Sequence, residues 1–309
     1  MVKTALLFAG QGSQTVGMGR ELCGQYEVSR RIFSHANEVL GRDIQKICFE
    51  GPEDILTRTD NAQPGIFLTS MAGLEALRFL VPHLEFDAAA GLSLGEFTAL
   101  TAAGAVSFED GLRMVQLRGQ FMQEACESTN GGMASILSLD EAIVAEVCRE
   151  ADVDIANINC PGQIVISGDK DKVVKAIELA RSRGAKRAIP LVVAGAYHSR
   201  LMDSGRVKVA QALAGLSMQL PTVPVVSNVT ARPAGGVAEI KELLVRQVTS
   251  PVRWSESMQW LVSQGFTRFI ELGPGNVLSG LMKRINKGVE MLSVSDAATL
   301  NATVKTITS

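Results

Sequence analysis

The residue best suited to chemistry is Ser93, which lies between two glycines in the pentapeptide Gly91-Leu92-Ser93-Leu94-Gly95. Residues 86–90 before it end in a small apolar run typical of a buried strand, and residues 96–103 after it favour a helix. A sharp turn from strand to helix would present the serine hydroxyl over a helix N-terminus, where N–H groups favour negative charge. The pattern predicts an exposed serine nucleophile, and the alternative is an ordinary turn with a capping serine.

A serine nucleophile needs a general base at neutral pH, and the chain has only three histidines. His35 lies beside the apolar stripe of a helix expected over 18–40, and His83 follows a proline in a connection, so we expect both on the surface. His198 lies in a glycine-containing loop, a setting that suits a catalytic group. We therefore predict His198 as the base.

Arg118 is unusual because it falls on the apolar face of a helix expected from Ser107 to Glu124, between Met114 and Met122. A buried guanidinium needs an anionic partner, since its desolvation is costly. That partner could be a structural carboxylate, or a substrate carboxylate held by two parallel hydrogen bonds. The residues alone leave both possibilities open.

Length and composition describe a globular protein of one large domain or two, with 309 residues, 46% hydrophobic and 20% charged. The net charge of -2 argues against nucleic acid as a partner, and no apolar run is long enough to span a membrane. Five widely spaced cysteines without a C-x-x-C motif predict free thiols, and neither a disulfide framework nor a metal site. We expect a cytoplasmic protein.

The order of expected elements predicts two folding units. Strands alternate with helices in residues 1–129 and 196–309, which predicts a large α/β-hydrolase-like domain with a mostly parallel sheet around Ser93. Its expected elements include strands at 2–8, 224–229 and 269–272, and helices at 61–80 (with Pro64 near the first position), 202–213, 239–247 and 278–285. Residues 130–195, with a last strand at 186–193, follow a β-α-β-β-α-β order, which predicts an inserted ferredoxin-like α+β subdomain.

Several separated motifs, in order, resemble those of the malonyl-CoA:acyl carrier protein transacylases of bacterial fatty-acid synthesis, which are related to polyketide-synthase acyltransferases. The resemblance covers nearly the whole chain. It is carried by Gly10-Gln11-Gly12-Ser13-Gln14, by residues 91–96, by Gln116-Leu117-Arg118-Gly119 with Met122, by residues 159–168, by Arg246-Gln247 with residues 251–254, and by Gly273-Pro274-Gly275.

The resemblance implies an acyltransferase that moves a malonyl group from malonyl-CoA to the phosphopantetheine thiol of acyl carrier protein, by ping-pong kinetics and without a permanently bound cofactor. Ser93 would carry the acyl group, and His198 would act as base and then acid. The resemblance also implies that the N–H groups of Gln11 and Leu94 form the oxyanion hole and that Arg118 binds the malonyl carboxylate. It implies that the main-chain carbonyl of Gln247 orients His198. Finally, it implies that Gln63, Met122 and Asn159 line the site and that Tyr197 favours malonyl as the acyl group.

One departure is Leu92, which stands where the family usually has histidine, and which bears on local packing and fine substrate preference. The carrier could belong to fatty-acid or polyketide synthesis. A serine esterase or thioesterase is a further alternative, but its histidine usually lies near the C-terminus, whereas residues 199–309 follow His198. A third possible function is a non-catalytic module that binds the carrier protein. Two basic clusters could face an acidic carrier or be ordinary helix ends: Lys283, Arg284 and Lys287, and Arg183, Lys186 and Arg187.

Overall fold

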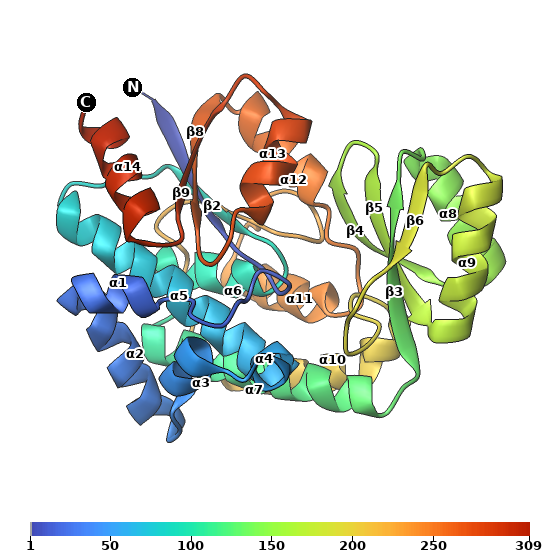
Figure 1. Cartoon of the computed structure of the whole chain (residues 1–309), viewed down its shortest axis with the longest axis horizontal. Helices are drawn as coiled ribbons and strands as arrows, with labels where there is room; N and C mark the ends of the chain where they lie inside the picture. Colours follow the sequence, from blue (N-terminus) through green and yellow to red (C-terminus); the bar gives the residue numbers. More distant parts are fainter. Residues whose placement is uncertain (1) are drawn as a thin grey trace.

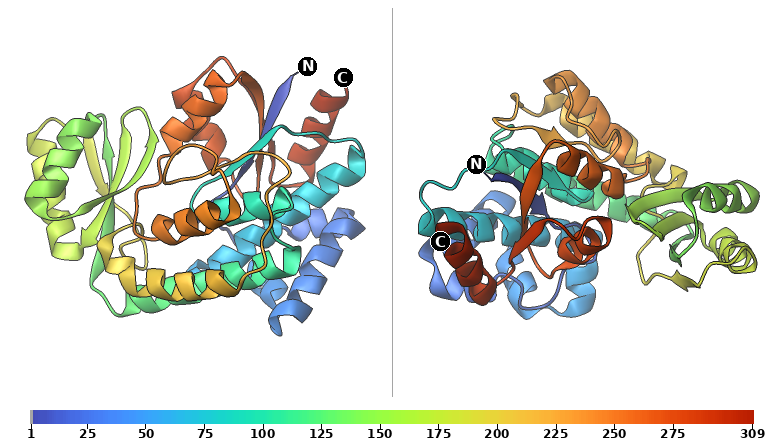
Figure 2. Two further views of the ribbon diagram at one scale, coloured as in Figure 1. Left: turned by 180° about the vertical axis from the view of Figure 1, so that it is seen from behind. Right: turned by 90° about the horizontal axis from the view of Figure 1, so that it is seen from above.

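The computed structural model describes residues 2–309 and contains two β-sheets. The larger has five strands in the order β7-β2-β1-β8-β9, and the smaller has four in the order β4-β5-β3-β6. Figure 1 shows the smaller sheet beside the larger body, with both chain ends on the far side of that body. Seen from above in Figure 2, the smaller unit projects from one side of the larger one.

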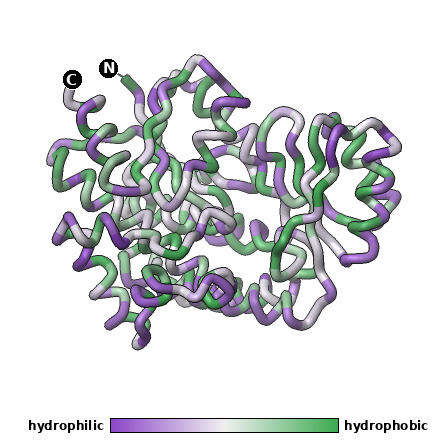
Figure 3. The backbone as a smooth tube through the Cα atoms, viewed as in Figure 1, coloured by the Kyte–Doolittle hydropathy of each residue, from purple (hydrophilic) through white to green (hydrophobic). Residues whose placement is uncertain are grey.

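Neighbouring strands of the larger sheet are all parallel: β1 (Lys3–Phe8), β2 (Ala88–Gly91), β7 (Val225–Val226), β8 (Phe266–Leu272) and β9 (Glu290–Val294). Alternate residues enter two cores, so Leu6 and Phe8 pack on one face while Ala5 and Leu7 pack on the other. A parallel sheet buried on both faces is the α/β architecture that the sequence predicted, and this part of the prediction is confirmed. Figure 3 shows hydrophobic stretches gathered inside this body.

Helices cover both faces of the larger sheet. The second core contains α12 (Trp254–Ser263) and α13 (Val277–Ile285), and the main core lies on the opposite face. The remaining helices of the larger unit are α1 (Arg20–Gln25), α2 (Glu27–Leu40), α3 (Ile44–Glu50), α4 (Glu53–Thr57), α5 (Thr59–Leu80), α6 (Leu94–Ala102), α7 (Phe108–Glu127), the short 3₁₀ helix η1 (Arg200–Met202), α10 (Asp203–Gly215), α11 (Val237–Gln247) and α14 (Ala297–Thr308). Within residues 2–309, none of the helices combines the length and apolar character that a membrane span requires.

The expected helix over 18–40 is wrong as a single element, because the structure divides it into α1 and α2. The chain is extended at Tyr26, with φ −121° and ψ 118°. The helix also starts later than predicted, since Gly17 and Gly19 adopt φ of 99° and 80°, outside the right-handed helical region. A periodic apolar stripe in the sequence can therefore continue across a residue at which the helix is interrupted.

The prediction that Pro64 lies near the start of its helix is also wrong, because α5 begins at Thr59 and Pro64 is in its interior. Proline cannot donate to the carbonyl four residues earlier, which belongs to Asp60. That carbonyl instead accepts a hydrogen bond from Nη2 of Arg42 at 2.8 Å. A side chain from outside the helix thus replaces the bond that proline removes.

The smaller unit consists of β3 (Gly131–Leu137), α8 (Glu141–Ala151), β4 (Asp154–Cys160), β5 (Gln163–Asp169), α9 (Lys170–Ser182) and β6 (Arg187–Pro190). Its paired strands are antiparallel, and it has its own hydrophobic core. Two expected strands are shorter than predicted: β6 stops at Pro190, where 186–193 was expected, and β7 covers only Val225–Val226 of 224–229. The residues after Pro190 form an exposed loop, and Val192 is fully exposed.

The two units are joined near the carboxyl ends of the larger sheet. The N–H of Ile158 on β4 donates to the carbonyl of Val252 at 2.9 Å, and the N–H of Val252 donates to Ala156 at 2.8 Å. In Figure 1, α8 and α9 cover the face of the smaller sheet that points away from the larger body. The opposite face therefore looks toward Ser93.

Candidate active site

Ser93 lies in the sharp turn between β2 and α6 and adopts φ 54° and ψ −105°. Positive φ is strained for a residue with a side chain and recurs at functional sites. The flanking glycines make the turn possible, because a Cβ on Gly91 would lie 1.9 Å from the Gly95 carbonyl, and one on Gly95 would lie 2.2 Å from the Phe8 oxygen. The N–H of Ser93 donates to Oδ1 of Asn228 at 2.6 Å, which ties the turn to the segment after β7.

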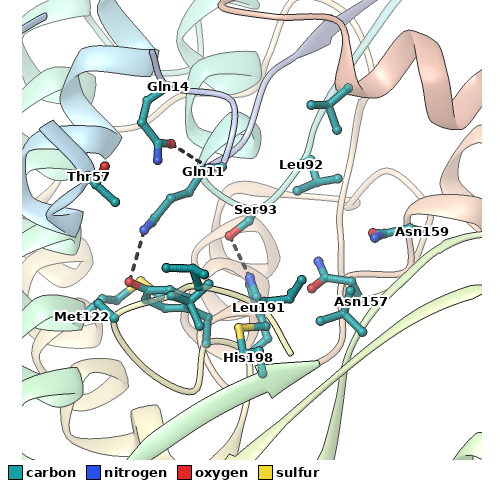
Figure 4. A pocket seen from close by; sticks show the side chains of 18 of the residues that line it. Gln11, Gln14, Thr57, Leu92, Ser93, Met122, Asn157, Asn159, Leu191 and His198 are labelled. Carbon is teal, nitrogen blue, oxygen red and sulfur yellow. Dashed lines mark hydrogen bonds between the residues drawn. The ribbon is translucent and has the colours of Figure 1, made fainter. Parts of the chain in front are cut away.

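His198 lies beside the serine, with its Nε2 2.8 Å from Ser93 Oγ and its Nδ1 2.8 Å from the carbonyl oxygen of Gln247. Because a carbonyl only accepts, Nδ1 carries the proton and Nε2 is free to accept one from Ser93. Burial lowers the pKa of His198 to about 4, and the nearby Arg118 charge adds to this effect. The imidazole is therefore neutral at pH 7. Figure 4 shows the two side chains pointing toward each other.

Arg118 is fully buried on α7, and its guanidinium reaches the same serine. Its Nη1 donates to Oε1 of Gln63 at 2.7 Å, and its Nη2 donates to Ser93 Oγ and to Oε1 of Gln247, each at 3.0 Å. Its Nε has no hydrogen-bond partner among the described residues. These partners are all neutral oxygens, so the guanidinium retains the capacity to bind a ligand carboxylate.

A cavity of about 370 Å³ lies over the serine and histidine, between the two units. Six of the predicted residues line it: Gln11, Ser93, Met122, Asn159, Tyr197 and His198. The other predicted residues, Gln63, Leu94, Arg118 and Gln247, are buried behind this lining. Figure 4 shows Asn157 and Asn159 of β4 on one side of Ser93, and Gln11 and Met122 on the other.

The loop after β1 packs against the nucleophile turn. A Cβ on Gly10 would lie 2.4 Å from the Leu92 oxygen, which places Gln11 next to the turn. The Gln11 side chain donates to the Tyr197 hydroxyl at 3.1 Å and accepts from Nε2 of Gln63 at 3.3 Å. Leu94 is the first residue of α6, so its N–H belongs to the helix N-terminus beside Ser93. The predicted oxyanion donors thus come from adjacent segments.

Three further residues, for which the sequence predicted no role, belong to this site. Thr59 Oγ1 lies 2.5 Å from the Tyr197 hydroxyl, and Asn228 Nδ2 donates to the Gly91 carbonyl at 2.7 Å. Glu96 is 3% exposed and accepts hydrogen bonds beneath the serine. A polar residue just after a buried strand could have pointed to Asn228, and a glutamate inside the nucleophile motif could have pointed to Glu96.

Leu92 is half-buried and lines the cavity beside Ser93, where it packs against the second core. Of the two basic clusters, the one at the end of α13 lies closer to the cavity. Nη2 of Arg284 donates to the Pro161 carbonyl at 3.0 Å and its Nη1 to Oε1 of Gln163, a lining residue, at 3.3 Å. In the other cluster, Arg183 is already paired with Glu150 and Glu146.

Comparison with known proteins places this fold and site in a class: residues 5–304 match the acyl transferase domain family. The chain is 46% identical over 312 residues to the malonyl CoA-acyl carrier protein transacylase of Bacillus subtilis (strain 168), covering 99% of this chain and 98% of the relative. It therefore belongs to the acyl transferase family and, within it, to the malonyl CoA-acyl carrier protein transacylases.

Solved structures agree with this assignment. The acyl-carrier-protein-S-malonyltransferase of Bartonella henselae superposes with a TM-score of 0.95 at 39% identity, covering 99% of this chain and 100% of the other. A malonyl-transacylase in complex with a type II PKS acyl-carrier protein superposes with a TM-score of 0.94 at 37% identity, covering 98% and 99%.

Proposed function

We propose that this protein transfers a malonyl group from malonyl-CoA to the phosphopantetheine thiol of an acyl carrier protein, through an acyl-enzyme on Ser93. The proposal rests on one observation: a base and a carboxylate-binding group both contact the hydroxyl oxygen of the nucleophilic serine. Ser93 Oγ contacts the neutral imidazole of His198 and the buried guanidinium of Arg118. A nucleophile, a base and a carboxylate-binding group are what malonyl transfer requires.

In the first half-reaction, Ser93 Oγ attacks the thioester carbonyl as His198 Nε2 takes its proton. The C–S bond then breaks, and the departing CoA sulfur takes that proton from the imidazolium. In the second half-reaction, His198 Nε2 takes the proton of the carrier thiol as its sulfur attacks the carbonyl of the serine ester. The ester C–O bond then breaks, and Ser93 Oγ takes that proton back from the imidazolium. The Gln247 carbonyl, 2.8 Å from Nδ1, holds the ring in the required tautomer and stabilises its charged form.

The tetrahedral intermediates need donors for their oxyanion, and we assign this role to the N–H groups of Gln11 and Leu94. The N-terminus of α6 adds a favourable dipole at this point. Arg118 would hold the malonyl carboxylate through its nitrogen donors. Gln63, Met122, Asn159 and Tyr197 would shape the space for the acyl group and the pantetheine arm.

The carrier class has two candidates. The similarity to the Bacillus subtilis transacylase favours a carrier of fatty-acid synthesis. A polyketide carrier is the second candidate, because one similar structure is a complex with such a carrier. The proposal needs no resident cofactor, since both substrates bring their own thiols.

We also propose finer descriptions of the two units. The nucleophile turn between a parallel strand and a helix supports an α/β-hydrolase-like large domain, with boundaries at 1–129 and 196–309. The β-α-β-β-α-β order and the strand order β4-β5-β3-β6 support a ferredoxin-like subdomain over 130–195.

The test is the mass of the intact protein after mixing with malonyl-CoA, with and without carrier protein. We expect a malonyl adduct that disappears when carrier is added and reappears on the carrier. Ser93→Ala should form no adduct. Ser135→Ala is a matched control, since both serines are 8% exposed and the Ser135 hydroxyl has no partner among the described residues. Hydrolysis without transfer would indicate an esterase, and absence of any adduct in the wild type would indicate a carrier-binding module.

A further inference from the structure

A buried carboxylate that the mechanism above does not use lies directly beneath the nucleophile. Glu96, near the start of α6, is 3% exposed. Its Oε2 accepts from the backbone N–H of Asn228 at 3.0 Å and from Nε2 of Gln247 at 2.7 Å. Burying an ionisable group in this way is costly unless the group is paired.

Glu96 is one of three neighbours that together fix which way the Gln247 amide points. Nε2 of Gln247 faces two acceptors, the Glu96 carboxylate and the Ser93 carbonyl at 3.0 Å, whereas Oε1 faces the Arg118 guanidinium. Carboxylates and carbonyls only accept, and guanidinium only donates, so a single amide orientation satisfies all three neighbours. A buried anion is thus connected to a buried cation through one amide.

The charges around Glu96 are few. Arg118 of α7 is a charged side chain whose field acts on Glu96, and it favours the ionised carboxylate. His198, from the segment before η1, is neutral at pH 7. The segments after β7 and at the end of α11 contribute the neutral groups Ser227, Asn228 and Gln247. A carboxylate bound to Arg118 would therefore be a second anion in the same buried network.

We propose that Glu96 is the internal counter-ion of Arg118 and a specificity-determining positioning residue, whose ionised form weakens, and whose protonated form strengthens, the preference of the site for a carboxylate-bearing acyl group. This inference rests on the proposed function, because it takes malonyl as the acyl group. When Glu96 is ionised, the buried network is neutral while empty and gains a net negative charge with malonyl bound. When Glu96 is protonated, the incoming carboxylate neutralises Arg118 instead.

The direction of the pH effect follows from burial. Burial raises the pKa of Glu96 to about 7, although Arg118 and several hydrogen bonds oppose the shift. Below pH 7 the protonated form prevails and malonyl should be favoured most strongly. Above pH 7 the ionised form competes with malonyl for Arg118, and the preference should decline.

The experiment compares kcat/KM for malonyl-CoA and acetyl-CoA at pH values from about 5 to 8, which reports the titration of the free enzyme. In the wild type, the malonyl-to-acetyl ratio should fall roughly tenfold as pH rises through 7, the equivalent of one pKa unit. Glu96→Gln can keep both accepted hydrogen bonds through its amide oxygen but carries no charge. Its ratio should be high and independent of pH.

Glu271→Gln is the matched control. Glu271 is also a fully buried glutamate, but it accepts from the N–H groups of Leu278 and Ser279 at the start of α13. Its variant should keep the pH-dependent ratio of the wild type.

A wild-type ratio that does not change with pH overturns the inference without any variant, and so does a Glu96→Gln ratio that keeps the wild-type slope. If Glu96→Gln does not fold, Glu96→Asp is the second variant, because it retains the charge and its malonyl-to-acetyl ratio should still fall with pH. A ratio that does not change with pH in Glu96→Asp also overturns the inference. A wild type that accepts no malonyl at all would instead contradict the proposed function.

Discussion

At the scale of single residues, the lowered pKa of His198 predicts that the enzyme stays active at low pH. The base must be neutral, and burial followed by the Arg118 charge lowers the pKa of His198 from 6.5 to about 4. A lowered pKa keeps the neutral form present down to lower pH, so the acid limb of kcat/KM should lie near pH 4 rather than near 6.5. A pH–rate profile, with folding followed by circular dichroism, measures this limb.

Substitution tests the same assignment. His198→Ala should lower both half-reactions by about 10²–10⁴-fold, the usual loss when general acid–base catalysis is removed. His35→Ala is the control, because its side chain is 46% exposed and bonded to Glu109. An acid limb near 6.5, or near-normal rates in His198→Ala, would mean that another group is the base.

A second prediction concerns Arg118. Arg118→Ala should collapse malonyl transfer while acetyl transfer holds steady or rises, because the wild-type site leaves a buried guanidinium without its carboxylate when acetyl binds. Arg118→Lys should rescue poorly, since an ammonium cannot form two parallel hydrogen bonds. The measurement is kcat/KM for both substrates. An equal fall for both would make Arg118 a structural residue.

Short-range patterns allowed these residues to be singled out from the sequence. Ser93 lies in a local motif, His198 was one of only three histidines, and Arg118 stood out among methionines. Glu96 and Asn228 were missed because their roles depend on contacts across long stretches of chain. The Asn228 side chain bonds to Ser93, which lies 135 positions away, and Glu96 bonds to Gln247, which lies 151 positions away. No local pattern encodes such pairs.

At the scale of elements, the turn between β2 and α6 depends on glycine more than on any side chain contact. Gly91→Ala would place a Cβ 1.9 Å from the Gly95 backbone, where no flexible side chain can move aside. We expect the free energy of unfolding to fall by at least about 3 kcal/mol, since overpacking against backbone exceeds the usual core strain. Urea unfolding of the variant measures this change.

Gly280→Ala is the matched control for that substitution. Gly280 is helical, in α13, and a Cβ there would meet no atom within 4 Å. This variant should be more stable than the wild type by roughly 0.5–1 kcal/mol, because alanine loses less backbone entropy on folding. If the two variants unfold alike, the close approach at Gly91 does not constrain the turn.

Elements were predictable where the apolar period and the local backbone agreed, as in α7 and in β4 and β5 of the smaller sheet. They were not predictable where a distant group decided the outcome. Pro64 lies inside α5 because Arg42 supplies a replacement hydrogen bond, and the break at Tyr26 interrupts a continuous apolar stripe. β7 is short because it only pairs with two residues of β2, Ala89 and Ala90.

At the scale of the whole molecule, the cavity over Ser93 is formed where the two units meet. The larger unit provides Ser93 and the buried Arg118, and the smaller unit provides Asn157 and Asn159 on the facing wall of the cavity. The rim beside this wall contains Arg284, which bonds to the β4–β5 turn at Pro161. We infer that a carrier delivering its thiol into the cavity approaches across this rim.

The last prediction concerns that approach. Acyl carrier proteins are acidic, and Lys283, Arg284 and Lys287 are exposed at the end of α13 near the cavity, so we infer that this cluster faces the carrier. Replacing all three with glutamate should raise KM for the carrier and weaken its dependence on salt, with a smaller change in KM for malonyl-CoA. Replacing Lys186 and Arg187, which are exposed at the start of the edge strand β6 (Lys186 just before it and Arg187 as its first residue), is the control and should change neither value. A larger effect from the β6 pair would move the docking surface to the smaller unit, and unchanged carrier kinetics in both variants would exclude both clusters.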